Sequence, residues 1–463
     1  MVFPSIEFAI FLPLVLAISW ALMPHPRLWK PFILVASYVF YAAASPRYCI
    51  LLAGVTLANQ AGAVLVQRAR DERSRRRLVA AMVAVDLGAL GVFKYYGFFV
   101  DEFGTFLNGI GLGMPLPLLT IALPIGLSFI VFQAISYVVD VKRGLLEPAQ
   151  TLDFAIYLSF FPHIVAGPIV RAREFLPQLR TPRDPRDVAV GAGVVLIMLG
   201  LVKKVALADY LAREVVDPVF GVPQAYAAPD VALAAYAYAA QIYCDFSGYT
   251  DIAIGVALLT GFVFPQNFRA PYRATSFRDF WRRWHITLSR FLRDFLYIPL
   301  GGNRDGEWRT ARNIMITMTL GGFWHGAAWG FVLWGAVHGT ALVIERRIAG
   351  RIPAPAWLRW AIVFHVVVFA FVLFRSESLG LAGDFFAQLA QPGAATLWTP
   401  VAVLAVVAVV GFQLLPERPL ERLRVRVADF SPGALAASLA AAIAIVGATV
   451  PSEGVPPFIY FQF

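Results

Sequence analysis

Residues 313–342 read NIMITMTLGGFWHGAAWGFVLWGAVHGTAL. Basic residues bound this apolar run at Arg312 and again at Arg346 and Arg347. A helix needs roughly 20 apolar residues to cross the hydrocarbon core of a bilayer, and this run is longer than that. The segment therefore predicts a membrane-spanning helix over 313–343.

Comparable apolar runs recur along the rest of the chain. Of the 463 residues, 59% are hydrophobic and 15% are charged, whereas a soluble domain is about one quarter charged. Further spans are expected at 5–22, 47–65, 78–95, 118–139, 187–209, 228–248, 357–374, 397–415 and 433–450. The runs at 30–44, 151–170 and 249–264 are shorter or interrupted by Pro and Gly, so re-entrant or tilted pieces are expected there. The sequence predicts an all-α, polytopic integral membrane protein, a single membrane-embedded domain over 1–463 with about eleven transmembrane helices.

Positive charge is concentrated between the apolar runs. The net charge is +10, and basic residues gather at 66–77, 171–186 and 416–427. Cytoplasmic loops carry such an excess, so we expect these segments on the cytoplasmic side and the loop near Asp101 and Glu102 on the other side. The basic residues then set topology and contact anionic membrane lipids, or they attract an anionic substrate at the cytoplasmic face. No nucleic acid is expected as a partner.

The longest polar stretch, residues 265–312, predicts an amphipathic helix. Ser276 and Asp279 have the spacing of a capping box, so a helix should begin there. Apolar side chains then recur every three or four positions and form one face, at Phe277, Trp281, Trp284, Leu288, Phe291, Leu292 and Phe295. This helix is expected to rest at the membrane surface until Gly301 and Gly302 end it.

One polar residue, His285, falls on the apolar side of this expected helix. An imidazole in that position needs a hydrogen-bond partner or a chemical role. Taken alone, a structural histidine with its hydrogen bonds satisfied is the simpler interpretation.

A second histidine, His325, lies near the middle of the apolar run. An ionisable residue at membrane depth is rare and indicates a functional site. The small residues around it, such as Gly322 and Gly326, allow close approach of another helix or of a substrate. His338 follows 13 residues later, which in a continuous helix is ~20 Å along the axis and roughly 220° around it. The two side chains could share one site only if the helix breaks, so His338 is expected to be structural.

Two segments carry a family resemblance: WRRWHITLSRFLRDFLYIPLGGN (281–303) and GGFWHGAAWGFVLWGAVHG (321–339). They resemble the membrane-bound O-acyltransferase family, and within it the bacterial branch of the alginate O-acetyltransferase membrane subunit. Four other stretches agree in the order of the family, FKYYGFF (93–99), LPIGLSFIVFQAISYVVDVKRG (123–144), FPHIVAGPIVR (161–171) and YCDFSGYTDIAIG (243–255). The resemblance covers roughly residues 1–380. Residues 381–463 then add further membrane helices without a recognisable motif.

The resemblance implies a fold of about eleven spanning helices around a funnel through a bacterial inner membrane. It implies that His325 matches the catalytic histidine of the family and that His285 matches its second signature position. It also implies acyl transfer from a cytoplasmic thioester donor to a hydroxyl outside, on an exported polysaccharide, directly or through a periplasmic partner transferase. Acetyl-CoA or another acyl thioester is the expected donor, with no bound cofactor and no metal.

The chemistry of acyl transfer suggests a role for each residue. Transfer from a thioester to a hydroxyl needs a base, and His325 is the expected base, or the nucleophile of a two-step transfer. His285 would bind or polarise the donor. The expected tunnel wall consists of Trp284, Trp324 and Trp329, and the expected basic face for an anionic donor consists of Arg282, Arg283, Arg290 and Arg293.

Other functions remain open at this point. Intramembrane histidines also serve as proton relays in transporters, although the repeated halves common in transporters are not seen. A scaffold that only holds a periplasmic transferase would not need the two histidine motifs. Peptidoglycan or teichoic acid could replace the exopolysaccharide as acceptor.

Overall fold

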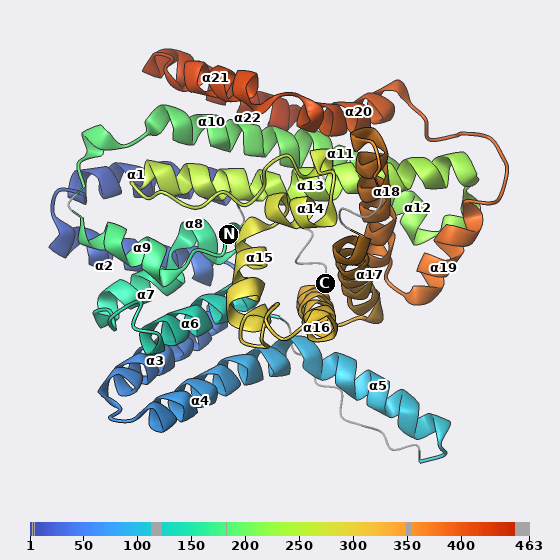
Figure 1. Ribbon diagram of the computed structural model, residues 1–463. Coiled ribbons are helices and arrows are strands. Elements are labelled where there is room, and N and C mark those ends of the chain that lie inside the picture. Colours follow the sequence, from blue (N-terminus) through green and yellow to red (C-terminus); the bar gives the residue numbers. More distant parts are fainter. Residues whose placement is uncertain (2, 4, 113–122, 182, 349–352, 450–463) are drawn as a thin grey trace. The chain divides into compact units, whose positions relative to one another are not determined.

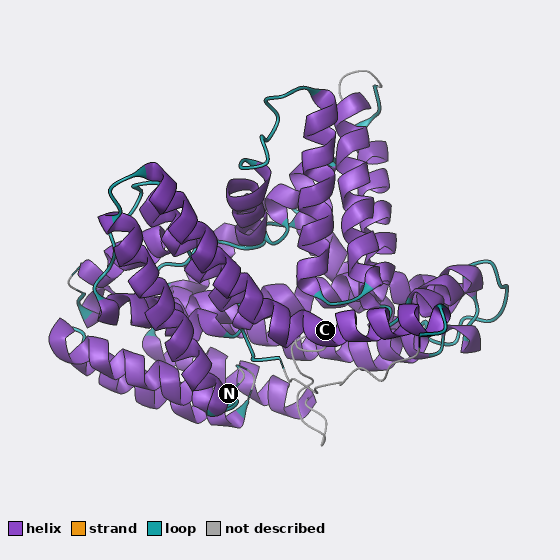
Figure 2. Cartoon of the chain, turned by 90° about the horizontal axis from the view of Figure 1, so that it is seen from below, coloured by secondary structure: helices purple, strands orange, loops and turns teal. Residues whose placement is uncertain are grey.

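The computed structural model describes residues 1–463 except 2, 4, 113–122, 182, 349–352 and 450–463. Every regular element in the described residues is a helix (Figures 1 and 2). The chain divides into two compact units, Met1–Val188 with Ala257–Phe264, and Ala189–Val256 with Pro265–Phe463. The predicted all-α class is therefore confirmed.

The first unit contains helices α1 to α9. Their bounds are α1 Ile6–Leu22, α2 Pro26–Ala42, α3 Arg47–Arg68, α4 Glu72–Leu90, α5 Tyr96–Gly109, α6 Leu127–Lys142, α7 Thr151–Ser159, α8 Phe161–Ile164 and α9 Ala172–Arg180, with a π turn at Gly91–Tyr95 and a 3-10 turn at Pro185–Asp187. Helices α3, α4 and α6 pack together (Figure 1). Buried aromatic rings fill the core near α9, where Phe175 stacks on Phe262 with ring centroids 4.7 Å apart.

The second unit contains helices α10 to α22. Their bounds are α10 Val190–Leu201, α11 Asp209–Leu211, α12 Asp217–Gly221, α13 Ala228–Leu259, α14 Phe277–Arg283, α15 Ile286–Leu292, α16 Glu307–His325, α17 Trp329–Ile348, α18 Ala356–Arg375, α19 Leu379–Gln388, α20 Pro400–Leu414, α21 Glu417–Ala428 and α22 Pro432–Thr449. Three π turns occur at Val202–Ala208, Ala212–Val216 and Arg293–Tyr297, and two 3-10 turns at Pro223–Ala225 and Pro271–Arg273. The last three residues of α13 belong to the first unit.

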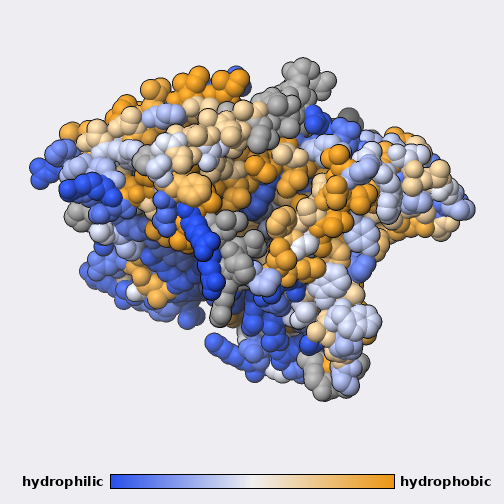
Figure 3. Space-filling model, turned by 90° about the horizontal axis from the view of Figure 1, so that it is seen from above, coloured by the Kyte–Doolittle hydropathy of each residue, from blue (hydrophilic) through white to orange (hydrophobic). Residues whose placement is uncertain are grey.

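Several of these helices are suited to a lipid environment. Within the described residues, five continuous helical segments are long and apolar enough to cross a membrane, at Arg47–Arg68, Glu72–Gly109, Val190–Gly221, Ala228–Leu259 and Ala356–Arg375. Shorter apolar helices lie at Ile6–Leu22, Pro400–Leu414 and Gly433–Ala442. Large apolar side chains are exposed over broad areas, as Figure 3 shows for one face, and Ile50 is 79% exposed. The chain is a multi-pass membrane protein, and the number of eleven spans stays a prediction.

Two expected features of the helix boundaries are wrong. Residues 228–248 and 249–264 are not a span followed by a re-entrant piece, because α13 continues unbroken to Leu259. The predicted loop near Asp101 and Glu102 is helical, since the helix that starts at Glu72 runs on through a π turn to Gly109. Polar residues did not end either helix because neither helix contains a proline beyond its first turn, where a proline would break the backbone hydrogen bonds. Residues 118–122 of the expected span 118–139 lie outside the described part.

The expected single span 313–343 is also wrong, because the chain turns back at Gly326–Ala328. The run forms a hairpin of α16 and α17, packed closely along glycines (Figure 1). A Cβ atom added at Gly322 would lie 2.2 Å from the carbonyl oxygen of Phe331, and one added at Gly335 would lie 2.3 Å from that of Met318. The glycines are therefore explained by helix packing, because a larger residue would force the two backbones apart.

Helices α10 and α13 also meet at glycines. A Cβ added at Gly200 would lie 2.5 Å from the carbonyl oxygen of Gly248, and one added at Gly255 would lie 2.6 Å from that of Gly193. The two glycines on each helix are seven residues apart, about two helical turns, and they pair in opposite order. The antiparallel helices α10 and α13 can therefore pack closely along the line of these four glycines.

Candidate functional site

The segment that carries His285 is not one amphipathic helix. Ser276 caps α14 as predicted, because its Oγ accepts a hydrogen bond from the backbone N–H of Asp279 at 3.0 Å. The helix then stops at Arg283, and α15 begins only at Ile286. Between them His285 has a left-handed backbone conformation, with φ 42° and ψ 54°. This conformation is costly for a residue other than glycine, and such strain is concentrated at functional sites.

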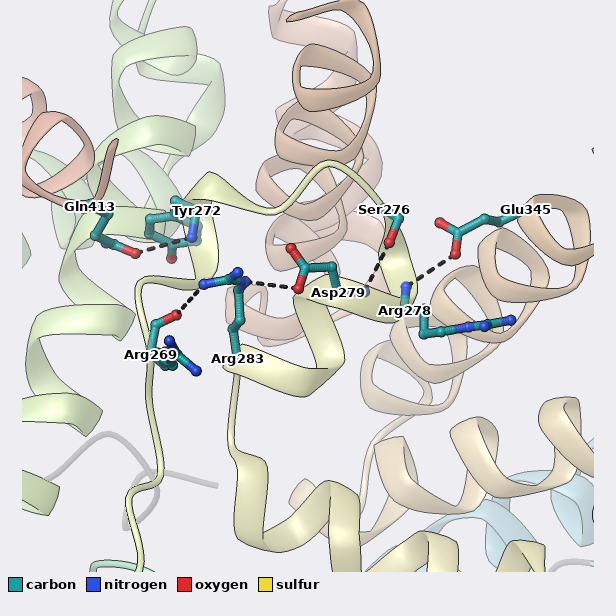
Figure 4. A network of polar contacts seen from close by, with 8 residues as sticks. All are labelled: Arg269, Tyr272, Ser276, Arg278, Asp279, Arg283, Glu345 and Gln413. Atoms are coloured by element: carbon teal, nitrogen blue, oxygen red, sulfur yellow. Dashed lines mark hydrogen bonds and ion pairs between the residues drawn. The ribbon is translucent and has the colours of Figure 1, made fainter. Parts of the chain in front are cut away.

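A polar network holds this break in place (Figure 4). Arg283 donates from Nε to the Asp279 carboxylate at 2.9 Å and from Nη1 to the carbonyl oxygen of Arg269 at 3.2 Å. The Glu345 carboxylate on α17 accepts the backbone N–H of Arg278 at 3.2 Å. A carboxylate at a helix N-terminus also interacts favourably with the helix dipole. The short helix α14 is thus fastened at both ends.

The hydrogen bonds around His285 fix which ring nitrogen carries the proton. His285 is fully buried, and its Nδ1 lies 3.2 Å from Oδ1 of Asn267. That oxygen also accepts the backbone N–H of Thr287 at 3.2 Å and the Thr287 hydroxyl at 2.9 Å, so it is an acceptor and Nδ1–H is the donor. Nε2 has no hydrogen-bond partner among the described residues. A neutral His285 therefore presents the lone pair of Nε2.

His325 lies beside His285. It is the last residue of α16 and is 2% exposed. The centroids of the two imidazole rings are 6.4 Å apart, close enough for one reacting group to contact both. The hairpin turn after His325 places its ring against α17 and α18, with Trp334 at 5.3 Å and Phe374 at 5.2 Å.

Aromatic rings enclose both histidines. Phe246 of α13 contacts the His285 ring edge to face at 4.7 Å. Trp324 contacts both histidines, with its ring centroid 6.3 Å from that of His285 and 5.0 Å from that of His325. A site of this kind excludes water, which strengthens electrostatic interactions within it.

The structure separates the three predicted wall tryptophans. Trp324 contacts both histidines, as expected. Trp284 is buried and its ring contacts the site indirectly, for example through Phe268, whose ring lies 5.1 Å from Trp284 and 6.4 Å from His285. Trp329 starts α17 on the far side of the turn and is half exposed.

The four predicted arginines also differ. Arg283 is engaged in the network around α14, and Arg293 pairs with Asp294 at 2.6 Å. Arg290 is half-buried on α15. Arg282 is exposed and makes no ion pair or hydrogen bond within the described residues. Arg282 is thus the member of this set whose charge is most available to a ligand.

Three contributors to the site were missed from the sequence: Asn267, Phe246 and Trp334. His338 is fully buried on α17, and its ring lies 4.8 Å from Trp334, the tryptophan that also contacts His325. The helix does break between His325 and His338, which was the condition for the two side chains to come close, and both rings contact Trp334. Neither ring nitrogen of His338 has a hydrogen-bond partner in the described part of the chain. The described residues hold no group of three or more His, Cys, Asp or Glu side chains arranged for a metal ion.

Known proteins resemble this chain over most of its length. The family model of the membrane-bound O-acyltransferase family matches residues 127–376. The probable alginate O-acetylase AlgI of Azotobacter vinelandii is 42% identical over 406 residues, 86% of this chain and 79% of the relative. That of Pseudomonas aeruginosa strain PAO1 is 43% identical over 390 residues, 82% of this chain and 73% of the relative. The peptidoglycan O-acetyltransferase of Helicobacter pylori is 34% identical over 388 residues, 76% of this chain and 72% of the relative.

Proposed function

The chain belongs to the membrane-bound O-acyltransferase family, and on that premise we propose that it transfers an acetyl group to hydroxyls of an exported polysaccharide. The observation that carries the proposal is the pair of buried imidazoles, His285 and His325, with ring centroids 6.4 Å apart inside an aromatic enclosure. Two of the similar proteins are named for alginate O-acetylation, which favours an exopolysaccharide acceptor. The peptidoglycan O-acetyltransferase leaves peptidoglycan as the second candidate.

In the proposed reaction His325 is the general base. It takes the proton of the acceptor hydroxyl, whose oxygen attacks the carbonyl carbon of the acyl thioester. The new C–O ester bond forms, the C–S bond breaks, and the proton is returned to the departing thiolate. Neutral imidazole suits both steps because its ordinary pKa lies near 7. A nucleophilic His325 that carries the acyl group for one step is the alternative.

His285 has the complementary role in this proposal. Its Nδ1–H is engaged by Asn267, so the ring can turn only its Nε2 toward a ligand. A neutral Nε2 accepts a hydrogen bond from the donor or the acceptor, and a protonated Nε2 would stabilise a developing oxyanion. In either state Asn267 orients the imidazole, as hydrogen-bonded partners do for catalytic histidines elsewhere.

The sides of the reaction follow from the charge pattern. We assign the donor, acetyl-CoA or another acyl thioester, to the cytoplasmic side, where the basic segments 66–77 and 171–186 are expected. The acceptor then lies across a bacterial inner membrane, reached directly or through a periplasmic partner transferase. About eleven spans around a central funnel would provide the route.

A deletion experiment tests the function. Removing the gene from its host is expected to eliminate O-acetyl esters from the exported polysaccharide, and a plasmid copy should restore them. Ester content is measured separately on the exopolysaccharide and on peptidoglycan, which distinguishes the two acceptors. Unchanged ester content in both polymers, together with loss of a proton flux in membrane vesicles, would instead support the alternative that the chain is a transporter with a histidine proton relay.

The role of Arg282 gives a second test. Arg282→Ala is expected to weaken donor affinity up to about fivefold and to reduce its salt dependence, because one unpaired exposed charge is lost. Arg283 is unsuitable for this test because it holds the α14 network. Arg70→Ala is the matched control, since it removes one exposed positive charge from another segment expected to be cytoplasmic. Equal effects of the two substitutions on the Michaelis constant for the donor would contradict a specific role for Arg282.

A further inference from the structure

The first unit contains a polar cavity, whose lining residues are remote in sequence from the two histidines. It has a volume of about 320 Å³ and is lined by Met23, Pro26, Lys30, Gln150, Asp153, Leu179, Arg180, Thr181 and Arg183. Three of these residues are basic and one is acidic. The lining comes from the starts of α2 and α7, the end of α9 and the segment that follows it.

The charges in this cavity do not balance. Lys30 Nζ lies 2.6 Å from the Asp153 carboxylate, so that pair neutralises itself. Arg180 and Arg183 have no ion pair with any described carboxylate, and Asp184 is bonded to Arg186 instead. The lining therefore holds two positive charges without a carboxylate partner. Arg180 is exposed, whereas Arg183 is partly buried, and a positive charge that is partly removed from water without a counter-ion is costly.

Arg183 is held rigidly in this unbalanced state. Its guanidinium carbon lies 3.7 Å from the ring centroid of Trp29 and 4.4 Å from that of Phe262. One guanidinium nitrogen, Nη1, donates to the carbonyl oxygen of Thr260 at 3.4 Å, and the other donors have no partner in the described residues. Burial lowers the pKa of Arg183 to about 10, which still leaves it charged at neutral pH. Stacking fixes the plane of the guanidinium, which can then bind a planar or tetrahedral anion bidentately, through two of its N–H groups.

Two helix N-termini add to the positive potential. Neither His25 before α2 nor Gln150 before α7 caps its helix with a side-chain hydrogen bond. In α2 Pro26 has no N–H and the N–H groups of Leu28 and Trp29 donate to the carbonyl oxygen of His25, so the helix dipole is its main contribution. In α7 the N–H groups before Phe154 have no side-chain cap and favour an anion. Gln150 itself lines the cavity.

We propose that this cavity binds a phosphate group, held by Arg180 and Arg183 beside the Lys30–Asp153 pair. A cavity of this size accommodates a phosphate or pyrophosphate group. The phosphate belongs either to the headgroup of an anionic phospholipid or to a soluble phosphorylated compound. The site is distinct from the two histidines and does not rest on the proposed acyl transfer.

Ligand-dependent thermal stability tests this assignment. The full chain is purified in an uncharged detergent, and its melting temperature is followed against inorganic pyrophosphate, phosphatidylglycerol or phosphatidylcholine at constant ionic strength. Pyrophosphate that raises the melting temperature and competes with phosphatidylglycerol identifies a soluble ligand. A rise with phosphatidylglycerol alone identifies a lipid headgroup. The proposal is overturned if neither pyrophosphate nor phosphatidylglycerol raises the melting temperature.

Two matched variants make the test specific. Arg180→Gln removes an exposed side chain with no described hydrogen bond, so the fold should remain intact, and the apparent dissociation constant should rise about tenfold. Arg186→Gln removes the same charge three residues from Arg183, but Arg186 is bonded to Asp184 and does not line the cavity. It should bind like the natural chain. An equal loss in both variants would mean nonspecific charge attraction and would overturn the proposal.

Discussion

Replacing His325 with alanine is expected to abolish measurable acyl transfer while the protein still inserts in the membrane. General-base catalysis is worth about 10²–10⁴ in rate, and the enclosure offers no exposed water to replace the base. Some loss of stability is expected as well, because the ring packs against Trp324, Trp334 and Phe374 and its removal leaves a cavity. The measurements are membrane abundance, melting temperature, and acetyl esters on the exported polymer.

His338→Ala is the matched control for this variant. His338 is the same residue type, is equally buried, and contacts the same tryptophan, but its ring faces Phe280 and Trp281 and not His285. Both variants should lose similar stability, whereas only His325→Ala should lose all transfer. Full acetylation by the His325 variant would end the base assignment. Equal partial losses in the two variants would show that the histidines act through packing alone.

The pairing of His285 with His325 illustrates what local sequence patterns can predict. Each histidine was singled out by its setting, His285 on an apolar face and His325 inside an apolar run. The structure places both in one enclosure, with ring centroids 6.4 Å apart. Hydrophobic periodicity identifies which positions are buried. It does not indicate which buried positions of different helices meet.

The hairpin at Gly326–Ala328 was missed for a physical reason. An apolar run with glycines is compatible with one long helix or with two helices that pack against each other. The available sequence signal was the pair Gly322 and Gly335 on either side of the turn. In the structure a Cβ atom at either position would lie too close to a carbonyl oxygen of the other helix. Small residues on two faces of one run are typical of a helix that packs against its own continuation.

The partner of His285 could not be predicted at all. Asn267 lies 18 residues before His285 in a non-helical stretch that has no periodic pattern. Similarly, the left-handed backbone at His285 has no turn signature, although histidine is among the residues that tolerate positive φ better than most. Site residues that act from irregular segments are the ones that pattern-based prediction fails to find.

A buried ion-pair cluster in the second unit was also not anticipated. Lys204 lies in the π turn after α10 and is 2% exposed at its side chain. Its Nζ is 2.6 Å from the carboxylate of Asp209 and 2.7 Å from that of Asp245 on α13. The close approach of α10 and α13 at Gly200 and Gly248 brings the lysine to this depth. The cluster therefore joins the helix that carries Phe246, a neighbour of His285, to the preceding π turn.

Replacing Lys204 with methionine is expected to cost about 3–5 kcal/mol of unfolding free energy, the largest stability effect we predict. The substitution leaves two carboxylates together in a low-dielectric interior, where they repel each other and have lost the lysine charge that both of them contact. Lys203→Met is the matched control, because this adjacent lysine pairs with Asp251 at 2.6 Å but both side chains remain at least 20% exposed. Its loss should be smaller, since that pair is partly exposed and only one carboxylate loses its partner. Denaturant unfolding in mixed micelles measures both values.

Adding Asp245→Asn to Lys204→Met should recover part of the lost stability, because it removes one of the two negative charges left by the lysine. If the two lysine variants lose equal stability and the asparagine does not rescue, the cluster contributes no more than the single Lys203–Asp251 pair.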